Sequence, residues 1–488
     1  MKPRLCVTVT APTMAELRRR RDEVADADLV ELRLDSVRDP DVAGALEGRR
    51  RPVIVTCRPK WEHGGFSGAE EERRRILGAA LEQGAEYVDV EWRARFTDLI
   101  DSTAGRRVVV SVHEFDGVPS DLAGRVQAMR SVGAEVVKVA VRTNSLTDCV
   151  TLFDLGAQSG GRGDLVLVGM GEQGLATRVL AQRFGSAWTY AGSDTDIGQL
   201  SPQSILEDFR FRSLTDATRL FGIVGRPVAH SVSPAMHNAA FKAARLDAIY
   251  LPFPATDAAD FVRFAEAIGL EGASVTTPFK VPLFERVDEA DSTSRRVGAL
   301  NTIRVVDGRW MGANTDAGGF LKPLGERFLG KGVRVSILGA GGAARAVAIA
   351  LAAKEADVTI HARNAERAKE VALIGSARVG PWPPAAGTWD MLVNCTPVGT
   401  HPAVEATPLD AGHLTGRVVY DLVYNPPVTR LMRDAAAAGL QTIGGLEMLV
   451  AQAQEQSYWW TGVRPAGAVM REAALKQLAG YPDRSAGD

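Results

Sequence analysis

The first 212 residues repeat one pattern eight times: a short apolar run with strand character, followed by a longer stretch with helical spacing. The eight strand candidates are residues 5–9, 29–33, 52–56, 87–91, 108–112, 136–141, 165–168 and 187–190. Amphipathic stretches such as 69–83, 120–131 and 175–184 separate them. Eight strand-then-helix units in about 200 residues favour a closed (β/α)8 barrel over an open doubly wound sheet, which stays the alternative.

Lys138 lies in the middle of one of these apolar runs, residues 135–141. A charged side chain among β-branched residues is costly to bury unless a carboxylate pairs with it or it gives up its proton. The neutral amine that results is a nucleophile that condenses with carbonyl groups. On this residue alone, a salt-bridged or snorkelling lysine is the stronger interpretation.

Polar residues gather where the predicted barrel strands end, which is the face that carries the chemistry in barrels of this kind. They are Glu31, Arg33, Arg58, Glu62, His113 and Lys138. Each alone could form a structural ion pair. Together they predict a pocket with one amine nucleophile, one imidazole, arginines for an anionic substrate, and carboxylates that orient them.

Composition argues against several other functions. The net charge of −2 gives no reason to expect nucleic acid or an anionic membrane surface as partner, and we expect the arginine run 18–21 on a solvated helix face. No run of 18 apolar residues occurs and residues 1–10 alternate like a strand, so we expect neither a membrane span nor a signal peptide, and a cytoplasmic location. The cysteines and histidines form no metal-binding pattern, so no metal is expected.

The second half, from about residue 219, has its own alternation of strands and helices. A strand over 335–338 runs through the fingerprint G-x-G-x-x-A at 339–344 into a helix over 345–354. Such a turn brings backbone amides and a helix N-terminus to the pyrophosphate of a dinucleotide. Arg363 and Arg367 follow the next strand, where an NAD enzyme would place a carboxylate. They therefore favour NADP, with solvated surface arginines as the alternative.

Two further features of the second half suggest a substrate site. Ser231 and Ser233 precede a helix, where they could either cap it or seat a small carboxylate. Lys280 and Asp316 come from separate loops and could transfer a proton for a carbonyl and alcohol couple beside a nicotinamide.

These motifs resemble two known families joined in one chain. The first half resembles a type I 3-dehydroquinate dehydratase, through residues 31–35, Arg58 with Glu62, 111–115, 137–140, Arg178 and 198–199. The second half resembles a shikimate dehydrogenase, through residues 225–234, 276–280, 298–302, 314–316, 394–399, 420–426 and 448–452. The order, dehydratase before dehydrogenase, is similar to that of the plant-type bifunctional enzymes.

For the first half, the resemblance implies that Lys138 forms a Schiff base with the ketone of 3-dehydroquinate. His113 would act as general base and acid, with Glu62 tuning it, and the product would be 3-dehydroshikimate. No cofactor is implied. The implied substrate contacts are Glu31, Arg33, Arg58, Arg178, Thr195 and Gln199.

For the second half, the resemblance implies NADPH-dependent reduction of 3-dehydroshikimate to shikimate, with Lys280 and Asp316 as the catalytic pair. Both serines and Thr276 favour shikimate over quinate. The implied substrate contacts are Ser231, Ser233, Thr276, Asn301, Tyr424 and Gln452. The implied NADP contacts are Gly339, Gly341, Gly342, Ala343, Arg363, Asn364, Arg367, Thr396 and Gly445.

The sequence departs from the family patterns at three places. The lid of the dehydratase usually has a Ser/Ala-Pro-Gly-Gln element, whereas this chain has no proline in residues 195–199. Ser274 stands where many dehydrogenases have asparagine, and Ala362 stands where the phosphate loop has its asparagine. The departures bear on lid geometry and on the preference for NADP.

The predicted architecture is α/β: a barrel over 1–212, a substrate-binding lobe over 219–321 with 445–480, and a Rossmann NADP lobe over 322–444. Only small-molecule partners are expected, and the oligomeric state stays open. Three alternatives remain: a chain in which only the dehydrogenase half is active, a catalytically dead metabolite sensor, and an unrelated Schiff-base aldolase fused to an NADP reductase.

Overall fold

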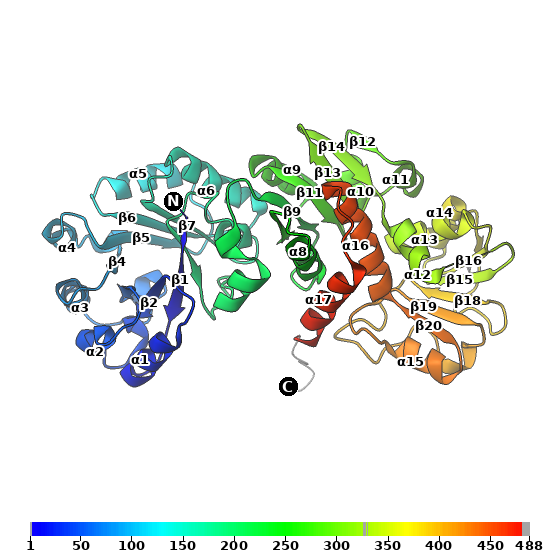
Figure 1. The fold of residues 1–488 in the computed structure, drawn as a ribbon, viewed down its shortest axis with the longest axis horizontal. Coiled ribbons are helices and arrows are strands. Elements are labelled where there is room, and N and C mark those ends of the chain that lie inside the picture. The colour runs from blue at the N-terminus through cyan, green and yellow to red at the C-terminus, as the bar shows by residue number, and fades with distance from the viewer. Residues whose placement is uncertain (1, 326–327, 329, 481–488) are drawn as a thin grey trace. The chain divides into compact units, whose positions relative to one another are not determined.

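The computed structural model describes residues 2–325, 328 and 330–480 (Figure 1). Two compact units share these residues. The first runs to Thr218 and includes Phe253–Gly269, and the second holds Arg219–Pro252 and the chain from Leu270 onward.

The first unit is built on eight parallel strands, which confirms the barrel prediction. They are β1 (Arg4–Val9), β2 (Leu29–Arg33), β3 (Val53–Thr56), β4 (Tyr87–Glu91), β5 (Val108–Glu114), β6 (Val136–Arg142), β7 (Leu165–Met170) and β8 (Trp188–Ala191). Their hydrogen-bonded order is β7-β6-β5-β4-β3-β2-β1-β8. The Ala187 N–H donates to the Leu165 carbonyl at 2.7 Å, so the two ends of the sheet meet in a nearly closed ring.

Helices follow the strands and lie around the outside of the ring (Figure 1). They are α1 (Met14–Glu23), α2 (Val42–Leu46), α3 (Glu70–Glu82), α4 (Thr97–Ser102), α5 (Leu122–Arg130), α6 (Leu146–Gln158) and α7 (Leu175–Val179). Helix α7 is shorter than the predicted 175–184. On α1, Arg19 and Arg20 are exposed and pair with Glu23 and Glu16, as expected for a solvated face. Arg21 differs, because it is buried and donates to the Ala45 carbonyl at 2.5 Å.

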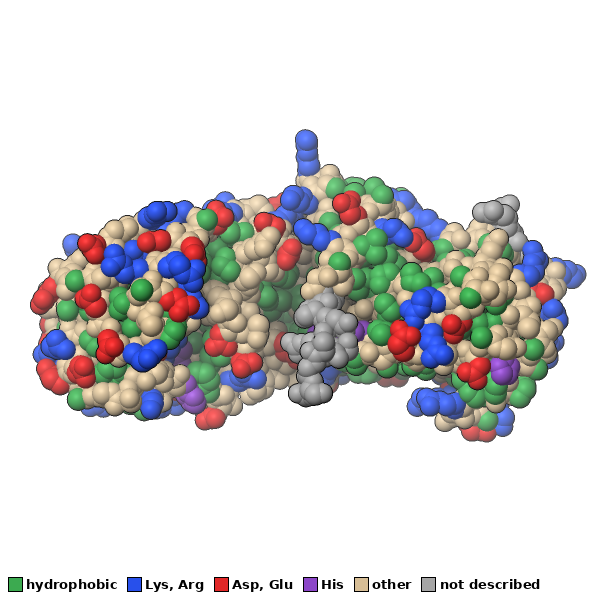
Figure 2. Space-filling view, turned by 90° about the horizontal axis from the view of Figure 1, so that it is seen from below, with side chains coloured by type: hydrophobic (Ala, Val, Ile, Leu, Met, Phe, Trp, Pro, Cys, Tyr) green, Lys and Arg blue, Asp and Glu red, His purple; other side chains and the backbone are tan. Residues whose placement is uncertain are grey.

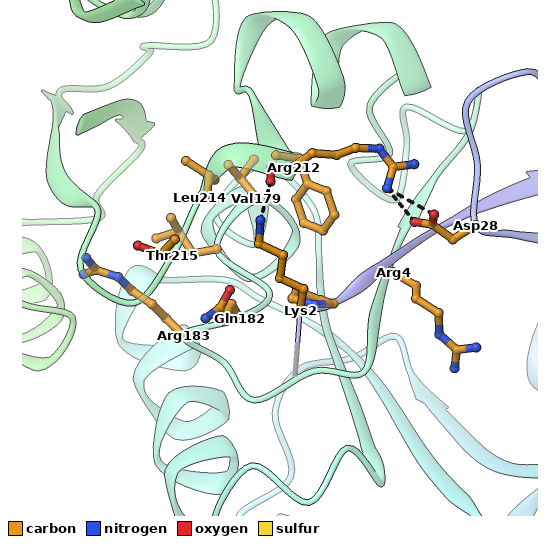
Figure 3. Close-up of a pocket in the computed structure, with 12 residues that line it drawn as sticks. Lys2, Arg4, Asp28, Val179, Gln182, Arg183, Arg212, Leu214 and Thr215 are labelled. Atoms are coloured by element: carbon orange, nitrogen blue, oxygen red, sulfur yellow. Dashed lines mark hydrogen bonds and ion pairs between the residues drawn. The ribbon is translucent and has the colours of Figure 1, made fainter. Parts of the chain in front are cut away.

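A cavity of about 290 Å³ lies at the amino-terminal end of the barrel strands, beside the start of β1 (Figure 3). Lys2 Nζ donates to the Arg212 carbonyl at 3.0 Å, and Arg212 pairs with Asp28 at 2.9 Å. These bonds fasten the segment that follows β8 against the bottom of the barrel. Lys2 and Arg212 therefore serve the fold at this face, which is opposite the face that carries the chemistry in such barrels.

The second unit contains a mixed sheet with the order β10-β9-β11-β13-β14-β12. The strands are β9 (Arg219–Val224), β10 (Ala248–Phe253), β11 (Leu270–Val275), β12 (Glu289–Ala290), β13 (Thr302–Val306) and β14 (Arg309–Ala313). The helices along this stretch are α8 (Ser233–Ala243), α9 (Ala258–Ala267), α10 (Lys280–Phe284), α11 (Ser292–Val297) and α12 (Asp316–Leu324). Helix α9 belongs to the first unit, where Asp260 accepts a hydrogen bond from the Thr147 N–H of α6 at 2.7 Å.

A third, fully parallel sheet has the order β17-β16-β15-β18-β19-β20. Its strands are β15 (Arg334–Leu338), β16 (Asp357–His361), β17 (Arg378–Val379), β18 (Met391–Asn394), β19 (Val418–Asp421) and β20 (Gln441–Gly444). Its helices are α13 (Gly342–Ala352), α14 (Ala365–Gly375) and α15 (Arg430–Ala437), and α16 (Gly445–Thr461) and α17 (Gly467–Ala479) end the described chain. Counted from β15, the strand order is 3-2-1-4-5-6, which confirms the Rossmann prediction.

On the face shown in Figure 2, basic and acidic side chains lie interspersed. This mixing agrees with the near-zero net charge of the chain. No helix among the described residues is both long enough and apolar enough to cross a membrane.

Candidate active sites

Lys138 points from β6 into the barrel and is 4% exposed. Its Nζ lies 2.9 Å from Asp89 Oδ2 and 3.3 Å from Glu31 Oε1, and 4.4 Å from the centre of the Tyr190 ring. The two carboxylates explain how the apolar strand tolerates the charge. Both lie close enough to the amine to accept a proton from it.

Both carboxylates are fixed by neighbouring strands. Glu31 accepts hydrogen bonds from the hydroxyls of Thr8 and Thr56, at 2.9 and 3.0 Å. Burial raises the pKa values of Glu31 and Asp89, but the positive charges of Lys138 and Arg58, with Arg33 near Glu31 and the Ser111 hydroxyl at Asp89, together outweigh it. Both pKa values therefore lie below their ordinary values. Both groups are therefore ionised beside Lys138 at neutral pH.

His113, near the end of β5, is held by Glu62 of the short turn Lys60–Glu62. Glu62 Oε1 accepts from the His113 backbone N–H at 2.9 Å and from Nδ1 at 2.8 Å. Burial, with the positive charge of Arg58, lowers the pKa of His113 well below its ordinary value. The ring is neutral, and Nε2 is its basic nitrogen, which contacts Arg58 Nη1. Burial and the Glu91 carboxylate raise the pKa of Glu62 to about 8.

The segment after β8 that stands in the place of a lid folds into a turn. Arg178 is buried and donates to the Ile197 carbonyl at 2.7 Å. Gln199 Oε1 accepts from the Asp194 N–H at 3.2 Å, and Gly198 adopts a φ of +73° that favours glycine. Burial lowers the pKa of Arg178 to about 10, so it stays charged at neutral pH.

The second unit brings four predicted residues together. Lys280 Nζ lies 2.6 Å from Asp316 Oδ2, and Asn301 Nδ2 donates to Asp316 Oδ1 at 2.7 Å. Asn301 Nδ2 also lies 3.3 Å from Gln452 Oε1. Lys280 begins α10, Asp316 begins α12 and Gln452 lies on α16, so three helices and the loop of Asn301 build this cluster.

The two serines that precede and begin α8 lie beside a buried hydrogen-bond network. Ser231 Oγ accepts from the Ser233 N–H at 3.2 Å, and the Tyr250 hydroxyl, which also interacts with Ser233, donates to Ser274 Oγ at 2.7 Å. Ser274 donates in turn to Gln456 Oε1 at 2.7 Å. The Ser274 hydroxyl is thus held between the side chains of Tyr250 and Gln456.

The dinucleotide fingerprint follows β15, between β16 and β18. Gly339 has a φ of +106°, and a Cβ on it would lie 3.1 Å from Thr396. A Cβ on Gly341 would meet nothing within 4 Å, and one on Gly342 would lie 3.8 Å from Lys280. The N-terminus of α13 is therefore uncovered at Gly341 and lies beside Lys280 at Gly342, and free backbone amides at such a position are the groups that hold a pyrophosphate.

The other expected cofactor residues lie around the same edge of the sheet. Arg363 and Arg367 are exposed after β16, and Asn364 caps α14 by accepting from the Arg367 N–H at 3.0 Å. A Cβ on Gly445 would lie 2.2 Å from the Leu422 carbonyl oxygen, so only glycine fits there.

Three family models match the chain. They are described as type I 3-dehydroquinase over residues 5–216, shikimate dehydrogenase substrate binding domain over 223–303, and shikimate 5'-dehydrogenase C-terminal domain over 445–475. The bifunctional 3-dehydroquinate dehydratase/shikimate dehydrogenase of Arabidopsis thaliana, described as chloroplastic, is 34% identical over 477 residues, covering 90% of this chain and 78% of that protein. The chain belongs to this bifunctional family.

Relatives of the dehydrogenase unit are more similar still. The NADP(+) shikimate dehydrogenase of Symbiobacterium thermophilum is 45% identical over 289 residues, covering 54% of this chain and 96% of that protein. A crystal structure of a shikimate dehydrogenase in complex with NADP+ has a TM-score of 0.52 and 34% identity, covering 54% of this chain and 97% of that chain. The fold of the dehydrogenase unit is therefore that of its family.

The structure groups the predicted dehydratase residues in two sets. Lys138, Glu31, Arg58, His113 and Glu62 are in mutual contact or share a partner. Thr195, which is exposed, and Gln199 belong to the lid turn, and Arg178 of α7 donates to this turn. Arg33 pairs with Asp35 at 2.7 Å, at the end of β2.

In the dehydrogenase unit, the predicted substrate residues form the Lys280 cluster and the serine pair. Thr276 follows β11, and its N–H donates to the Val224 carbonyl at 2.9 Å. Tyr424 packs against the apolar cluster that includes Val232, next to the serines. Thr396 follows β18 and hydrogen-bonds Asn394 at 2.7 Å.

Sequence reasoning missed several residues that the structure places at the two sites. In the dehydratase they are Asp89, Glu91, Ser111 and Tyr190, and in the dehydrogenase Tyr250, Thr315 and Gln456. Asp89 and Glu91 alternate within the predicted strand 87–91, so they share a face with each other. Two carboxylates on one face of a predicted barrel strand were the feature of the sequence that indicated Asp89 and Glu91.

Proposed function

We propose that this chain carries out two consecutive reactions, dehydration of 3-dehydroquinate in the barrel and NADPH-dependent reduction of 3-dehydroshikimate in the second unit. The observation that carries the first is Lys138, buried between two carboxylates and within reach of the His113, Glu62 and Arg58 cluster. The family membership supports both steps and their order along the chain.

In the dehydratase, the Lys138 ammonium gives one proton to Asp89, the nearer of its two carboxylates, and the neutral amine adds to the substrate ketone, with loss of water, to form an imine. His113 Nε2 removes a proton from the adjacent carbon, and the electron pair moves toward the imine. The hydroxyl on the next carbon then leaves as water with the proton that His113 returns. Hydrolysis of the imine frees 3-dehydroshikimate and Lys138, so the net change is the loss of one water.

Arg58 must leave His113 Nε2 for this proton transfer, and binding of an anionic or hydroxylated substrate group to Arg58 provides the reason. Arg33, Arg178, Thr195 and Gln199 complete the proposed substrate contacts. The Glu62 carboxylate accepts the Nδ1 proton of His113 and so keeps Nε2 free of hydrogen.

In the dehydrogenase, Lys280 gives a proton to the substrate oxygen and afterwards regains a proton from solvent, while the Asp316 carboxylate holds the ammonium in place. Bound NADPH supplies a hydride to the ketone carbon. Ser231, Ser233 and Tyr424 seat the carboxylate. Thr276, Asn301 and Gln452 bind the oxygens on the ring of 3-dehydroshikimate.

The proposed cofactor site uses the open cradle in front of α13. Gly339, Gly341, Gly342 and Ala343 would hold the pyrophosphate, and Arg363 with Arg367 the 2′-phosphate. Asn364, Thr396 and Gly445 line the same edge of the sheet. The absence of a cofactor and of a metal in the dehydratase stays a prediction.

We infer domain boundaries of 1–212 for the dehydratase, 219–321 with 445–480 for the substrate lobe, and 322–444 for the NADP lobe. The family models over 5–216, 223–303 and 445–475 support the first two domains, and the parallel sheet β15 to β20 supports the NADP lobe. A cytoplasmic location and interaction with small molecules alone stay predictions.

One assay tests the function of the whole chain: 3-dehydroquinate with NADPH should yield shikimate.

Borohydride trapping tests the first reaction alone. Borohydride added with 3-dehydroquinate should increase the mass of the peptide that contains Lys138, and Lys138→Ala should abolish the label. Exposed Lys60, on the turn beside the site, offers the matched control, since Lys60→Ala should keep it. Label on another peptide, or none, would contradict the assignment.

For the second reaction, NADPH oxidation should require 3-dehydroshikimate and disappear in Lys280→Ala. Exposed Lys354, in the turn after α13, is the matched control, and Lys354→Ala should keep the activity. A chain in which only the dehydrogenase is active would pass this second test and fail the first, and a metabolite sensor would fail both.

A further inference from the structure

Glu91 ends β4 and is completely buried. Its Oε2 contacts Arg73 Nη1, and its Oε1 lies 3.6 Å from Arg58 Nε. Among the described residues, neither this Oε1 nor Arg58 Nε has a hydrogen-bond partner. One carboxylate oxygen of Glu91 therefore faces the one guanidinium nitrogen of Arg58 that is still free.

Arg73 comes from α3, on the outside of the barrel wall, and its side chain is also completely buried. It binds Glu70 Oε2 through Nε and Nη2, at 3.0 and 2.6 Å. It lies over the rings of Phe96 and Trp61, at 4.8 and 5.7 Å. Arg73 is thus held on three sides before it reaches Glu91.

Arg73 reaches Arg58 by two routes. One passes through the Glu91 carboxylate, and in the other Arg73 Nη1 donates to the Cys57 carbonyl at 3.4 Å, in the residue directly before Arg58. Arg58 itself contacts Asp89 at 3.3 Å and His113 Nε2. A continuous chain of charged contacts therefore links the outer helix to the general base.

We propose that Glu91 and Arg73 are positioning residues of the dehydratase, which hold the Arg58 guanidinium where it can meet the substrate and the general base. The proposal rests on the dehydratase function proposed above. A buried ion pair is weak evidence for stability, because a well-packed apolar pair often serves as well. Positioning of Arg58 explains why the Arg73–Glu91 ion pair is present. The planar guanidinium of Arg58 keeps one orientation only when its neighbours are themselves held in place.

The charge of Glu91 also affects the pKa of Glu62, the carboxyl group that holds His113. Glu62 is faced by Asp89 and Glu91 from β4, by Arg58 after β3, and by His113 from β5. After burial, the Glu91 carboxylate is the strongest influence that raises the pKa of Glu62. Burial raises the pKa of Glu91 itself to about 7, although Arg58 and Arg73 oppose this. Removal of the Glu91 charge should lower the pKa of Glu62.

The test is Glu91→Gln, which keeps the shape of the side chain and its bond to Arg73 but removes the charge. We expect the KM for 3-dehydroquinate to rise about tenfold with kcat changed less than about threefold, because substrate binding by Arg58 is what weakens. We expect kcat/KM to rise with pH as Glu62 ionises, and Glu62→Gln should abolish this rise, which assigns it to Glu62. In Glu91→Gln the same rise should occur about one pH unit lower. Arg73→Lys should also raise KM, since a lysine ammonium cannot contact Glu70, Glu91 and the Cys57 carbonyl at once as the guanidinium does.

Two controls separate positioning from general damage. Glu71→Gln removes the same charge from the exposed side of α3, where Glu71 pairs with Arg74, and should leave KM and the pH profile unchanged. Arg58→Lys with Glu91→Gln should lose no more than Arg58→Lys alone, because Glu91 acts through Arg58. Losses that multiply, or a fall in thermal stability with unchanged KM and pH profile, would overturn the proposal. Absence of dehydration in the unmodified protein would instead overturn the dehydratase function itself.

Discussion

Lys138 Nζ and Asp89 Oδ2 lie 2.9 Å apart inside the barrel, although 49 residues separate them in the chain. Asp89 also accepts from Ser111 Oγ at 2.5 Å and from Arg58 at 3.3 Å, so one carboxylate joins the amine and the arginine of the site. This position makes Asp89 the natural acceptor for the proton that Lys138 must lose before it attacks a ketone.

Asp89→Asn should therefore lower the dehydratase kcat by about 100-fold. The amide keeps a similar shape but cannot accept the ammonium proton, and it removes one of the two charges that pair with Lys138. Steady-state rates with 3-dehydroquinate and the yield of borohydride-trapped Lys138 should both fall. Reduction of 3-dehydroshikimate by the same variant is the internal control and should be unchanged. A normal yield of trapped Lys138 would show that Glu31 alone suffices.

The dehydratase should become faster as pH rises toward 8. The pKa of Glu62 is raised to about 8, chiefly by burial, and only the ionised carboxylate is a full acceptor for the His113 Nδ1 proton. Activity is thus low below this pKa, where Glu62 is protonated, and rises as the proton is lost. Glu62→Gln should flatten this part of the pH profile of kcat/KM. A rise that persists in the variant would point to another group.

Asp316→Asn should lower the dehydrogenase kcat by about 100-fold or more, because the Lys280 ammonium loses its charged partner at 2.6 Å. Dehydration of 3-dehydroquinate by the same protein should be unaffected. Asp307→Asn, in an exposed turn of the same unit, is the matched control and should keep full activity. Equal rates for the two variants would remove Asp316 from the mechanism.

Arg363→Ala should raise the KM for NADPH about tenfold or more and leave the KM for NADH unchanged, since one charge-assisted bond to the 2′-phosphate is lost. The matched control is Arg378→Ala, at an exposed arginine that pairs with Asp357. If Arg363 is a solvated surface arginine instead, both variants will show the same small change.

The dehydrogenase unit should lose stability as pH falls below about 6.5. His237 is completely buried and stacks on Tyr250 with ring centres 4.4 Å apart, and burial lowers its pKa to about 3. Between its folded and unfolded pKa values the unfolded state binds more protons, so each pH unit below 6.5 removes up to about 1.4 kcal/mol. Thermal inactivation of the dehydrogenase at pH 5 and pH 7.5 should differ less in His237→Phe than in the unmodified protein.

The barrel could be predicted because its repeat is local: each strand and helix has its own spacing of apolar residues. The same holds for the fingerprint at 339–344, where strand, turn and helix are consecutive in the chain. Helix α7 ends at Val179, earlier than its amphipathic spacing predicts. Beyond it, Arg183 donates to the Ile268 carbonyl at 2.8 Å, a contact between residues 85 apart that no local pattern announces.

The sequence by itself determined the alternation of strands and helices and the two joined families. It also predicted Lys138, His113 and the Lys280 pair as site residues, because each belongs to a short motif. Tertiary structure decided which other charges meet them. Asp89 and Glu91 belong to no motif that the sequence analysis recognised, and they reach the site because β4, β5 and β6 are adjacent strands whose inward side chains share one interior. Inside a buried space a charge must find a partner, and that partner is set by the register of the strands and not by distance along the chain.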